Sequence, residues 1–269
     1  MNILITGTNG FIGKNLKEKL SNQYNVFNFE ESDIEGDWKG KIRNIFNEGI
    51  DCVFHVGACS DTLEQRVNYM MLLNYEVTKH ITDLCVEYKV PLIYSSSAAN
   101  YGINDEYPSN LYGWSKYVGE GYVISNGGIG LRYFNVYGPG EEDKGRMSSV
   151  AYQMFLKNKN SEEIKLFPKK PKRDFVYVKD IVKANLFALE NYDTLSGKWY
   201  EVGSGEANPF ETILETMGLS FSYHDESIIP EGYQFYTCSS NFKWMPKWTP
   251  KFSLVEGIKD YVKYLNGQN

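Results

Sequence analysis

The chain has 269 residues, of which 42% are hydrophobic and 23% charged, so disordered and collagen-like classes are excluded and a large core is expected. Lys and Arg number 28 against 34 Asp and Glu, and the resulting net charge of −6 disfavours nucleic-acid binding through phosphates. No stretch approaches the roughly 18 apolar residues of a membrane span, and no signal peptide is visible. The 4 cysteines and 3 histidines lack the spacing of a metal site, so we expect a cytoplasmic protein with free thiols and no metal.

Short apolar runs alternate with helical patterns through the first half of the chain. The expected strands are residues 3–5, 26–29, 52–54, 92–94 and 130–134. The expected helices are residues 11–20, 67–88 and 111–125. This alternation is typical of βαβ units, and it predicts an α/β fold with a Rossmann-like, doubly wound parallel sheet.

Beyond residue 147 the pattern is looser. We expect a helix at 148–156, a short strand at 175–178, a helix at 181–189, a strand at 199–202 that returns to the main sheet, and a final helix at 254–265. The expected organisation is a nucleotide-binding domain of residues 1–147 plus about 174–205, and a smaller α+β substrate domain of residues 148–173 and 206–269.

A glycine-rich turn joins the first strand to the first helix. Its GxxGxxG spacing lets the backbone approach a pyrophosphate, and the helix N-terminus offers free N–H groups and a positive dipole end. The turn therefore predicts a dinucleotide site formed by Gly7, Gly10, Phe11, Ile12 and Gly13.

An acidic residue, Glu30, ends the second strand. A carboxylate at this place accepts hydrogen bonds from the adenosine ribose, which favours NAD over NADP. The next residues, Glu31 and Ser32, offer no cation for a 2′-phosphate.

Tyr112 and Lys116 lie one helical turn apart, on the same face of the helix expected at 111–125. A nearby ammonium, together with the positive ring of an oxidised nicotinamide, favours the phenolate that a tyrosine base requires. Ser97 ends the fourth strand, at the sheet edge where α/β folds bind ligands, and its hydroxyl is placed to hold a substrate oxygen. These residues predict a Ser-Tyr-Lys catalytic set.

These motifs, in this order, resemble the extended short-chain dehydrogenase/reductases, which include the nucleotide-sugar epimerases. Within that family, several segments look like the ADP-glycero-manno-heptose 6-epimerases, and the likeness runs from the first strand to the final helix. The segments are residues 54–60, 69–71, 96–102, 132–139, 144–147, 165–167 and 172–178.

The resemblance implies transient oxidation of the sugar at C6″ and return of the hydride to the opposite face. Tyr112 is then one acid/base and Lys144 the other, with Lys116 and Ser97 in support. Lys144 alone would be taken for part of a solvated charged loop. The resemblance also implies that Asn135 contacts substrate, and that the cofactor is lined by Val56, Gly57, Ala58, Cys59, Ser60 and Val136.

A basic loop, residues 165–173, suits the diphosphate of a sugar nucleotide, although such a loop is also compatible with simple solvation. By resemblance, the substrate contacts are Arg146, Gln153, Phe167, Arg173 and Tyr233. Arg146 and Gln153 differ in type from the residues usual at their positions. The family is commonly homo-oligomeric, so we expect a homo-oligomer that binds a nucleotide-diphosphate sugar.

The chain departs from the heptose epimerase pattern at several positions. Leu73 replaces an asparagine near the nicotinamide, Gly140 replaces an arginine, and Asp143 replaces a histidine. The cofactor preference is split, because Glu30 favours NAD whereas the resembled epimerases commonly use NADP.

The sequence is also compatible with two other functions. One is another sugar-nucleotide enzyme of the superfamily, a hexose 4-epimerase or a 4,6-dehydratase. Dehydration is disfavoured because Ala98 and Ala99 stand where dehydratases usually carry an Asp-Glu pair. The other is a non-catalytic nucleotide-binding protein, which the intact Ser-Tyr-Lys set disfavours.

Overall fold

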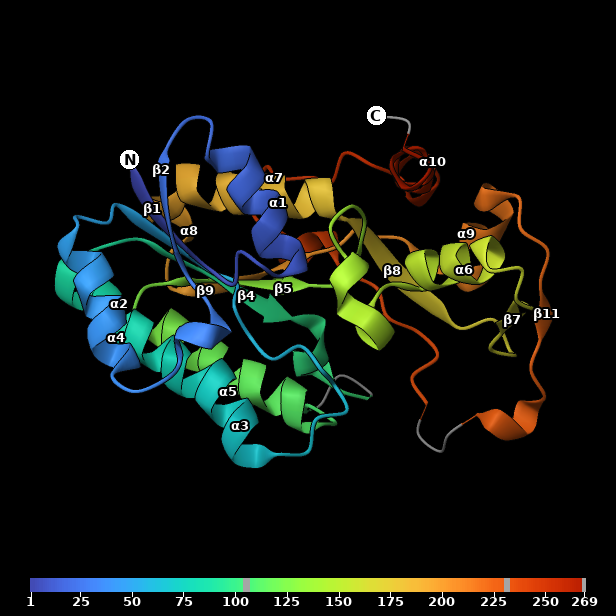
Figure 1. The fold of residues 1–269 in the computed structure, drawn as a ribbon, viewed down its shortest axis with the longest axis horizontal. Coiled ribbons are helices and arrows are strands. Elements are labelled where there is room, and N and C mark those ends of the chain that lie inside the picture. Colours follow the sequence, from blue (N-terminus) through green and yellow to red (C-terminus); the bar gives the residue numbers. More distant parts are fainter. Residues whose placement is uncertain (104–106, 230–232, 268–269) are drawn as a thin grey trace.

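The computed structural model of the protein describes residues 1–103, 107–229 and 233–267. A parallel sheet of six strands lies at its centre, in the order β2-β1-β3-β4-β5-β9 (Figure 1). The strands are β1 (Asn2–Thr6), β2 (Asn25–Phe29), β3 (Cys52–His55), β4 (Leu92–Ser97), β5 (Ile129–Tyr133) and β9 (Lys198–Val202). This order, with helices on both faces, confirms the doubly wound, Rossmann-like fold.

Helices cover both faces of the sheet. One face carries α1 (Phe11–Leu20), α7 (Val178–Glu190) and the short α8 (Tyr192–Leu195). The other carries α2 (Trp38–Asn47), α4 (Val77–Tyr88) and α5 (Leu111–Ser125). The strands are buried on both sides, so they read as nearly continuous apolar runs, which is why the sequence identified them.

The helix expected at 67–88 is interrupted. It consists of α3 (Val67–Met71), a π-helical segment η2 (Leu72–Glu76) and α4. The buried Asn74 lies in the π segment, where its side chain binds both backbone groups of Cys59, at 2.7 Å from the N–H and 2.9 Å from the carbonyl. Such π segments are frequent at functional sites.

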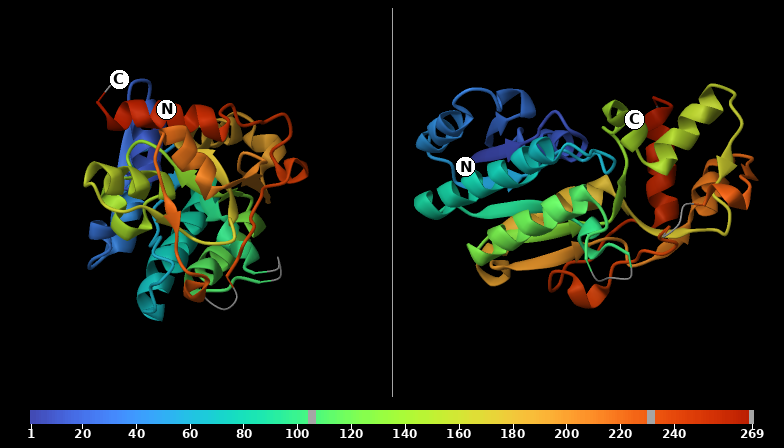
Figure 2. Two further views of the ribbon diagram at one scale, coloured as in Figure 1. Left: turned by 90° about the vertical axis from the view of Figure 1, so that its right-hand side faces the viewer. Right: turned by 90° about the horizontal axis from the view of Figure 1, so that it is seen from below.

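A second group of elements packs beside the carboxyl edge of the main sheet around its own apolar core (Figure 2). Its strands are β6 (Asn135–Tyr137), β8 (Lys172–Tyr177) and β10 (Ala207–Pro209) in one sheet, and β7 (Lys165–Leu166) with β11 (Ser222–Tyr223) in another. Its helices are α6 (Val150–Lys159), α9 (Phe210–Met217) and α10 (Leu254–Leu265).

The chain returns to the main sheet through β9, which pairs with β5, as expected for 199–202. The strand expected at 175–178 lies in the second group and ends at Tyr177, because Val178 begins α7. The sequence pattern did not indicate α2, where Ile42 and Phe46 are the buried residues and Gly40 weakens the helical signal. The expected domain boundaries stay a prediction.

Across the described residues, none of the helices combines the length and the apolar character needed to cross a membrane.

Candidate active site

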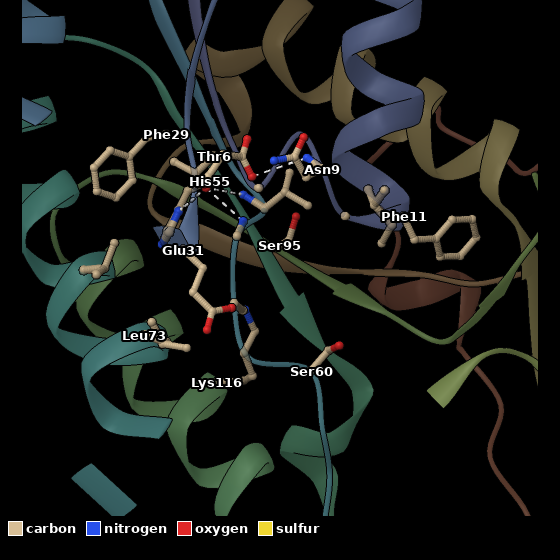
Figure 3. A pocket seen from close by; sticks show the side chains of 18 of the residues that line it. Thr6, Asn9, Phe11, Phe29, Glu31, His55, Ser60, Leu73, Ser95 and Lys116 are labelled. Carbon is tan, nitrogen blue, oxygen red and sulfur yellow. Dashed lines mark hydrogen bonds between the residues drawn. The ribbon is translucent and has the colours of Figure 1, made fainter. Parts of the chain in front are cut away.

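A cavity of about 470 Å³ follows the carboxyl ends of β1 to β5, the edge at which doubly wound sheets bind ligands (Figure 3). It collects residues that are far apart in the sequence. Those expected from the sequence are Gly7, Gly10, Phe11, Ile12, Glu30, Val56, Gly57, Ala58, Ser60, Tyr112, Lys116 and Lys144. Leu73, which replaces an asparagine of the heptose epimerase pattern, also lines the cavity.

The glycine turn is packed too closely for side chains. Gly7 has φ of +71°, and a Cβ there would lie 2.6 Å from the Cα of Gly57. A Cβ on Gly13 would lie 2.0 Å from the Gly7 carbonyl oxygen. The turn and the start of α1 therefore form a backbone cradle at the floor of the cavity, suited to a pyrophosphate.

The carboxylate of Glu30 binds this turn. It accepts hydrogen bonds from the N–H and hydroxyl of Thr8, at 2.8 and 2.7 Å, and from the N–H of Asn9 at 3.3 Å. Glu30 thus fastens the end of β2 to the glycine turn while it lines the cavity.

The loop after β3 is anchored by a hydrogen-bond relay that the sequence analysis did not identify. The Thr6 hydroxyl accepts from two N–H groups of that loop, at 3.0 and 2.8 Å, so its own hydrogen goes to Nδ1 of His55 at 2.7 Å. His55 Nε2 then carries the ring hydrogen and donates it to Thr78 at 2.8 Å. Thr78 in turn donates to the Asn74 carbonyl. Burial lowers the pKa of His55 to about 3, so the ring is neutral.

Cys59 is the one residue of the expected cofactor loop that turns away from the cavity. Its thiol is buried beside Met70 and Leu73, and burial raises its pKa. Its backbone is held by Asn74, so Cys59 shapes the loop and is not among the residues that line the cavity.

Lys116 is almost completely buried, with 2% exposure, although it lines the cavity. Its ammonium lies 4.3 Å from the centre of the Tyr94 ring. Burial lowers the pKa of Lys116 to about 7, and the carboxylate of Glu120, one turn later, opposes that shift. Glu120 is itself paired with Arg132 at 2.6 Å.

Tyr112 differs from the expectation in one respect. In the protein alone its pKa is raised, because burial disfavours the phenolate, and a hydrogen bond from the Ser97 side chain only partly offsets this. Lys116 is not among the groups that shift it. Ser97 also caps the short helix that follows β4, accepting from the Ala99 N–H at 3.1 Å.

Lys144 reaches the same cavity from a different element. It lies on the helical segment η4 (Glu142–Met147), and its amine is 5.2 Å from the centre of the Phe11 ring at the start of α1. Burial lowers the pKa of Lys144, and the charge of Glu141 opposes this. Gly140 stands before the segment with φ of +94°, a conformation that favours glycine over the family's usual arginine.

Three of the expected substrate contacts form a cluster in the second group of elements. Phe167 stacks on Tyr233 with ring centres 4.7 Å apart, and the Arg173 guanidinium lies 5.5 Å from the Tyr233 ring. Arg173 donates to the carbonyls of Lys172, at 2.9 Å, and of Gln234. Desolvation lowers the pKa of Arg173.

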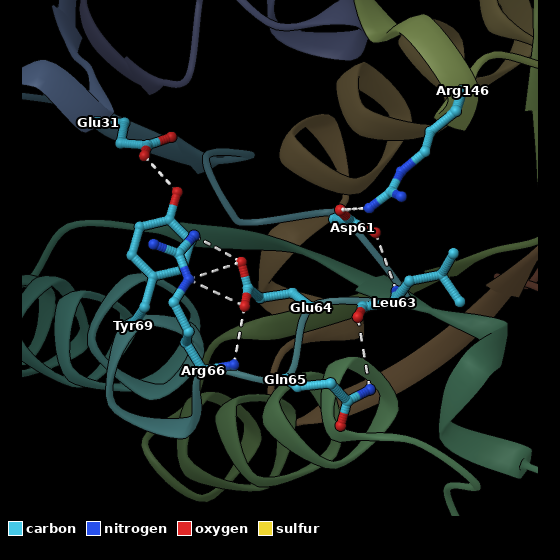
Figure 4. Close-up of polar contacts among 8 residues, drawn as sticks. All are labelled: Glu31, Asp61, Leu63, Glu64, Gln65, Arg66, Tyr69 and Arg146. Carbon is cyan, nitrogen blue, oxygen red and sulfur yellow. Dashed lines mark hydrogen bonds and ion pairs between the residues drawn. The ribbon is translucent and has the colours of Figure 1, made fainter.

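The other expected contacts are engaged within the protein. Asn135 donates to the Asp174 carbonyl at 3.1 Å, and Gln153 to the Ser148 carbonyl at 2.7 Å. Arg146 pairs with Asp61 at 2.6 Å (Figure 4). Val136 packs between the two cores and is not among the residues that line the cavity. In residues 1–103, 107–229 and 233–267 there is no cluster of three or more His, Cys, Asp or Glu able to hold a metal.

Comparison with known proteins identifies the family of the chain. The family model described as "NAD dependent epimerase/dehydratase family" matches residues 3–203. An ADP-L-glycero-D-manno-heptose-6-epimerase from Brachyspira hyodysenteriae is 35% identical, with 98% of this chain and 97% of the relative covered.

Two solved structures extend the likeness. The Helicobacter pylori ADP-L-glycero-D-manno-heptose-6-epimerase is 27% identical, with a TM-score of 0.80, covering 98% of this chain and 96% of the other. The UDP-glucose 4-epimerase of Thermotoga maritima, solved with UDP-glucose, is 25% identical, with a TM-score of 0.85 and 99% of each chain covered. The chain therefore belongs to the NAD dependent epimerase/dehydratase family.

Proposed function

We propose that this protein is a nucleotide-sugar epimerase that inverts C6″ of an ADP-glycero-manno-heptose through transient oxidation. The observation that carries this proposal is that Tyr112 and Lys144 line one cavity from different sides. Tyr112 belongs to α5, whereas Lys144 lies against Phe11 of α1, and these two helices cover opposite faces of the sheet. Inversion requires a proton donor or acceptor on each face of the reacting carbon, and this placement supplies both.

The residues present fit a nicotinamide dinucleotide. The glycine turn is a cradle that a Cβ would fill, and it lies at the N-terminus of α1. Gly7, Gly10, Ile12, Ser60 and Lys116 would hold the dinucleotide along the cavity. When bound, the nicotinamide ring supplies first a hydride acceptor and then a hydride donor.

The chain's own groups handle the proton and the sugar oxygen. Tyr112 takes the proton from the C6″ hydroxyl as the carbon loses its hydride, and Ser97 donates a hydrogen bond to that oxygen. The ketone then receives hydride on its other face, where Lys144 donates the proton that restores the hydroxyl. Because burial alone raises the pKa of Tyr112, the positive charges of Lys116 and the oxidised cofactor are required to offset it.

The nucleotide end of the substrate is assigned to the cluster of Phe167, Arg173 and Tyr233. Stacked rings suit a base, and a guanidinium suits a diphosphate. Asn135 is assigned to the sugar. Its side chain donates to the carbonyl of Asp174, which follows Arg173 of the cluster in the sequence. Arg146 and Gln153 would have to exchange their present partners to reach substrate.

NAD is favoured over NADP by the acidic character of one end of the cavity. Glu30, Glu31 and Ser32 line it, and the Tyr69 hydroxyl donates to Glu31 at 2.5 Å (Figure 4). Arg66 lies over the Tyr69 ring but is itself bound by Glu64 at 2.6 Å. A 2′-phosphate at this end would face carboxylates. Glu30 is assigned to the adenosine ribose.

The cytoplasm is the expected compartment because all 4 cysteines carry free thiols, three of them buried. A homo-oligomer likewise remains a prediction.

The test is to incubate the purified protein with ADP-D-glycero-D-manno-heptose without added dinucleotide and to follow C6″ by NMR. We expect the L-glycero product, and an ultraviolet spectrum that reveals retained cofactor. Turnover of UDP-glucose with no change in the heptose would instead identify a hexose 4-epimerase. Loss of water from the sugar would identify a dehydratase.

A further inference from the structure

One buried carboxylate closes the loop that carries Lys144. Glu141 has 0% exposure. Its carboxylate accepts from the Gly138 N–H at 3.1 Å, and from the N–H and hydroxyl of Ser149 at 2.5 and 2.8 Å. These partners stand at the two ends of the loop between β6 and α6, so a single side chain joins both ends.

The loop has further attachments: Asn15 donates to the Pro139 carbonyl at 2.8 Å, Gln153 donates to the Ser148 carbonyl at 2.7 Å, and two ion pairs lie at the surface. Asp143 pairs with Lys14 at 3.0 Å, and Arg146 pairs with Asp61 at 2.6 Å. Asp143 is 80% exposed and Arg146 is 66% exposed, and exposed ion pairs of this kind contribute little to stability. Breaking the hydrogen bonds of a buried carboxylate is far more disruptive. Glu141 is therefore a buried, charged clamp that joins both ends of this loop.

Glu141 also acts electrostatically on the amine that the loop presents. Charged and titratable groups lie on the loop itself, on the elements packed against it and across the cavity. Those of the loop and its neighbours are Glu141, Glu142, Asp143, Arg146, Lys14, Asp61, Tyr152, Tyr261 and Tyr264, and those that line the cavity are Glu30, Glu31, His55, Tyr112 and Lys116. Burial lowers the pKa of Lys144, and the charge of Glu141 opposes this shift.

We propose that Glu141 is the positioning residue for Lys144: its buried carboxylate joins both ends of the loop, so that the amine points into the cavity, and it places a negative charge on that loop. The inference rests on the role proposed above for Lys144. Glu141 itself touches neither substrate nor cofactor in this assignment.

The first experiment needs no substrate. The Lys144 amine of the full-length protein is labelled competitively with acetic anhydride across a pH series and quantified by mass spectrometry, with the exposed Lys19 as internal reference. In Glu141→Gln we expect the midpoint of Lys144 labelling to fall by about 1 pH unit, the size typical of losing a nearby opposite charge. The matched control is Glu142→Gln, which removes a charge from the next residue and should leave the midpoint in place.

A second variant separates the effect of the charge of Glu141 from the effect of the length of its side chain. Glu141→Asp keeps the charge but shortens the side chain, so it cannot span Gly138 and Ser149 equally well. We expect its midpoint to stay near wild type while the rate of Lys144 labelling rises severalfold. This variant also keeps the proposal testable if Glu141→Gln fails to fold. Wild-type behaviour of Glu141→Asp in both respects would overturn the clamp.

The kinetic arm uses whichever sugar nucleotide the wild type converts. We expect Glu141→Gln to lower kcat about tenfold with little change in KM, and to move the alkaline limb of the pH profile downward. An unchanged Lys144 midpoint in Glu141→Gln, or an equal shift in Glu142→Gln, would overturn the inference. If the wild type is inactive but the midpoint of Lys144 labelling shifts in Glu141→Gln, the proposed function is wrong and the role of Glu141 is still supported.

Discussion

The guanidinium of Arg146 lies 2.6 Å from the carboxylate of Asp61, and this pair joins the segment that carries Lys144 to the loop that follows β3 (Figure 4). Both connected segments contribute side chains to the cavity, Lys144 from one and Ser60 from the other. The pair therefore links two segments that both contribute to the lining of the cavity.

We expect Asp61→Asn to speed the release of bound dinucleotide severalfold at most, because the pair is largely exposed. Release is measured by the loss of NADH fluorescence after a chase with NAD, and 0.5 M salt should reproduce the effect in the wild type. If Arg146→Ala leaves release unaltered but raises the KM for the sugar nucleotide, Arg146 contacts substrate instead.

Tyr112→Phe should lower turnover by about 10²–10⁴-fold while the affinity for the dinucleotide changes less than about twofold, since only the proton-transferring hydroxyl is lost. Single-turnover kinetics and fluorescence titration measure the two quantities. Tyr117→Phe, on the exposed face of the same helix, is the control and should behave as wild type. Near-normal turnover of Tyr112→Phe would remove its assigned role.

Lys116 gives a pH dependence whose sign follows from its lowered pKa. Between about 7 and its ordinary value of 10.5, the unfolded chain binds more protons at this position than the folded one. The stability of the wild type should therefore rise with pH through this range. Lys116→Met lacks this contribution. The free energy of unfolding of the variant minus that of the wild type should therefore be largest below pH 7 and should decrease toward pH 10.5. Urea denaturation across pH measures it, and a constant difference would contradict the buried ammonium.

His55 should remain neutral throughout the physiological range. Nitrogen NMR of the ring is expected to show the Nε2–H form, with no titration between pH 8 and 5, because the pKa lies at about 3. Since its ordinary pKa is 6.5, the unfolded chain binds the extra proton first, and stability should fall as the pH drops from 6.5 toward 3. His55→Gln should show a shallower fall over that range. A ring that titrates near pH 6.5 would exclude the relay through Thr6 and Thr78.

Glu31→Arg should raise the affinity for NADP by roughly tenfold and weaken NAD binding only slightly, because it replaces a carboxylate at the acidic end of the cavity by a phosphate-binding group. Isothermal titration measures both affinities. Glu35→Arg changes the charge equally but outside the cavity lining, and serves as the control. Equal effects of the two variants would mean that net charge alone decides the preference.

Much of the main sheet was predictable because its signal is local. Strands such as β1 and β3 are buried on both faces and appear as apolar runs, and the glycine turn follows the first of them directly. The pairing of Tyr112 with Lys116 follows from helical spacing alone. Thr6 and His55 are register partners at the ends of the neighbouring strands β1 and β3. Their contact could therefore have been predicted from the sequence, although it was not.

Other features depend on tertiary contacts. The π segment carries Asn74, whose side chain bonds to the backbone of Cys59, and no spacing rule reveals that contact. Lys144 enters the cavity because Glu141 closes its loop, and without that contact the charged run resembles a solvated turn. The upward shift in the pKa of Tyr112 reflects burial, which the residue order does not report.

The position of β9 has a consequence for synthesis of the protein. This strand covers the outer edge of β5, yet it comes from residues 198–202, long after the other five strands have left the ribosome. Until it arrives, the nascent chain displays a bare row of backbone donors and acceptors on β5, the kind of edge that recruits strands from neighbouring molecules. A polypeptide stalled before residue 198 would thus carry an incomplete sheet, and such fragments should be prone to aggregate.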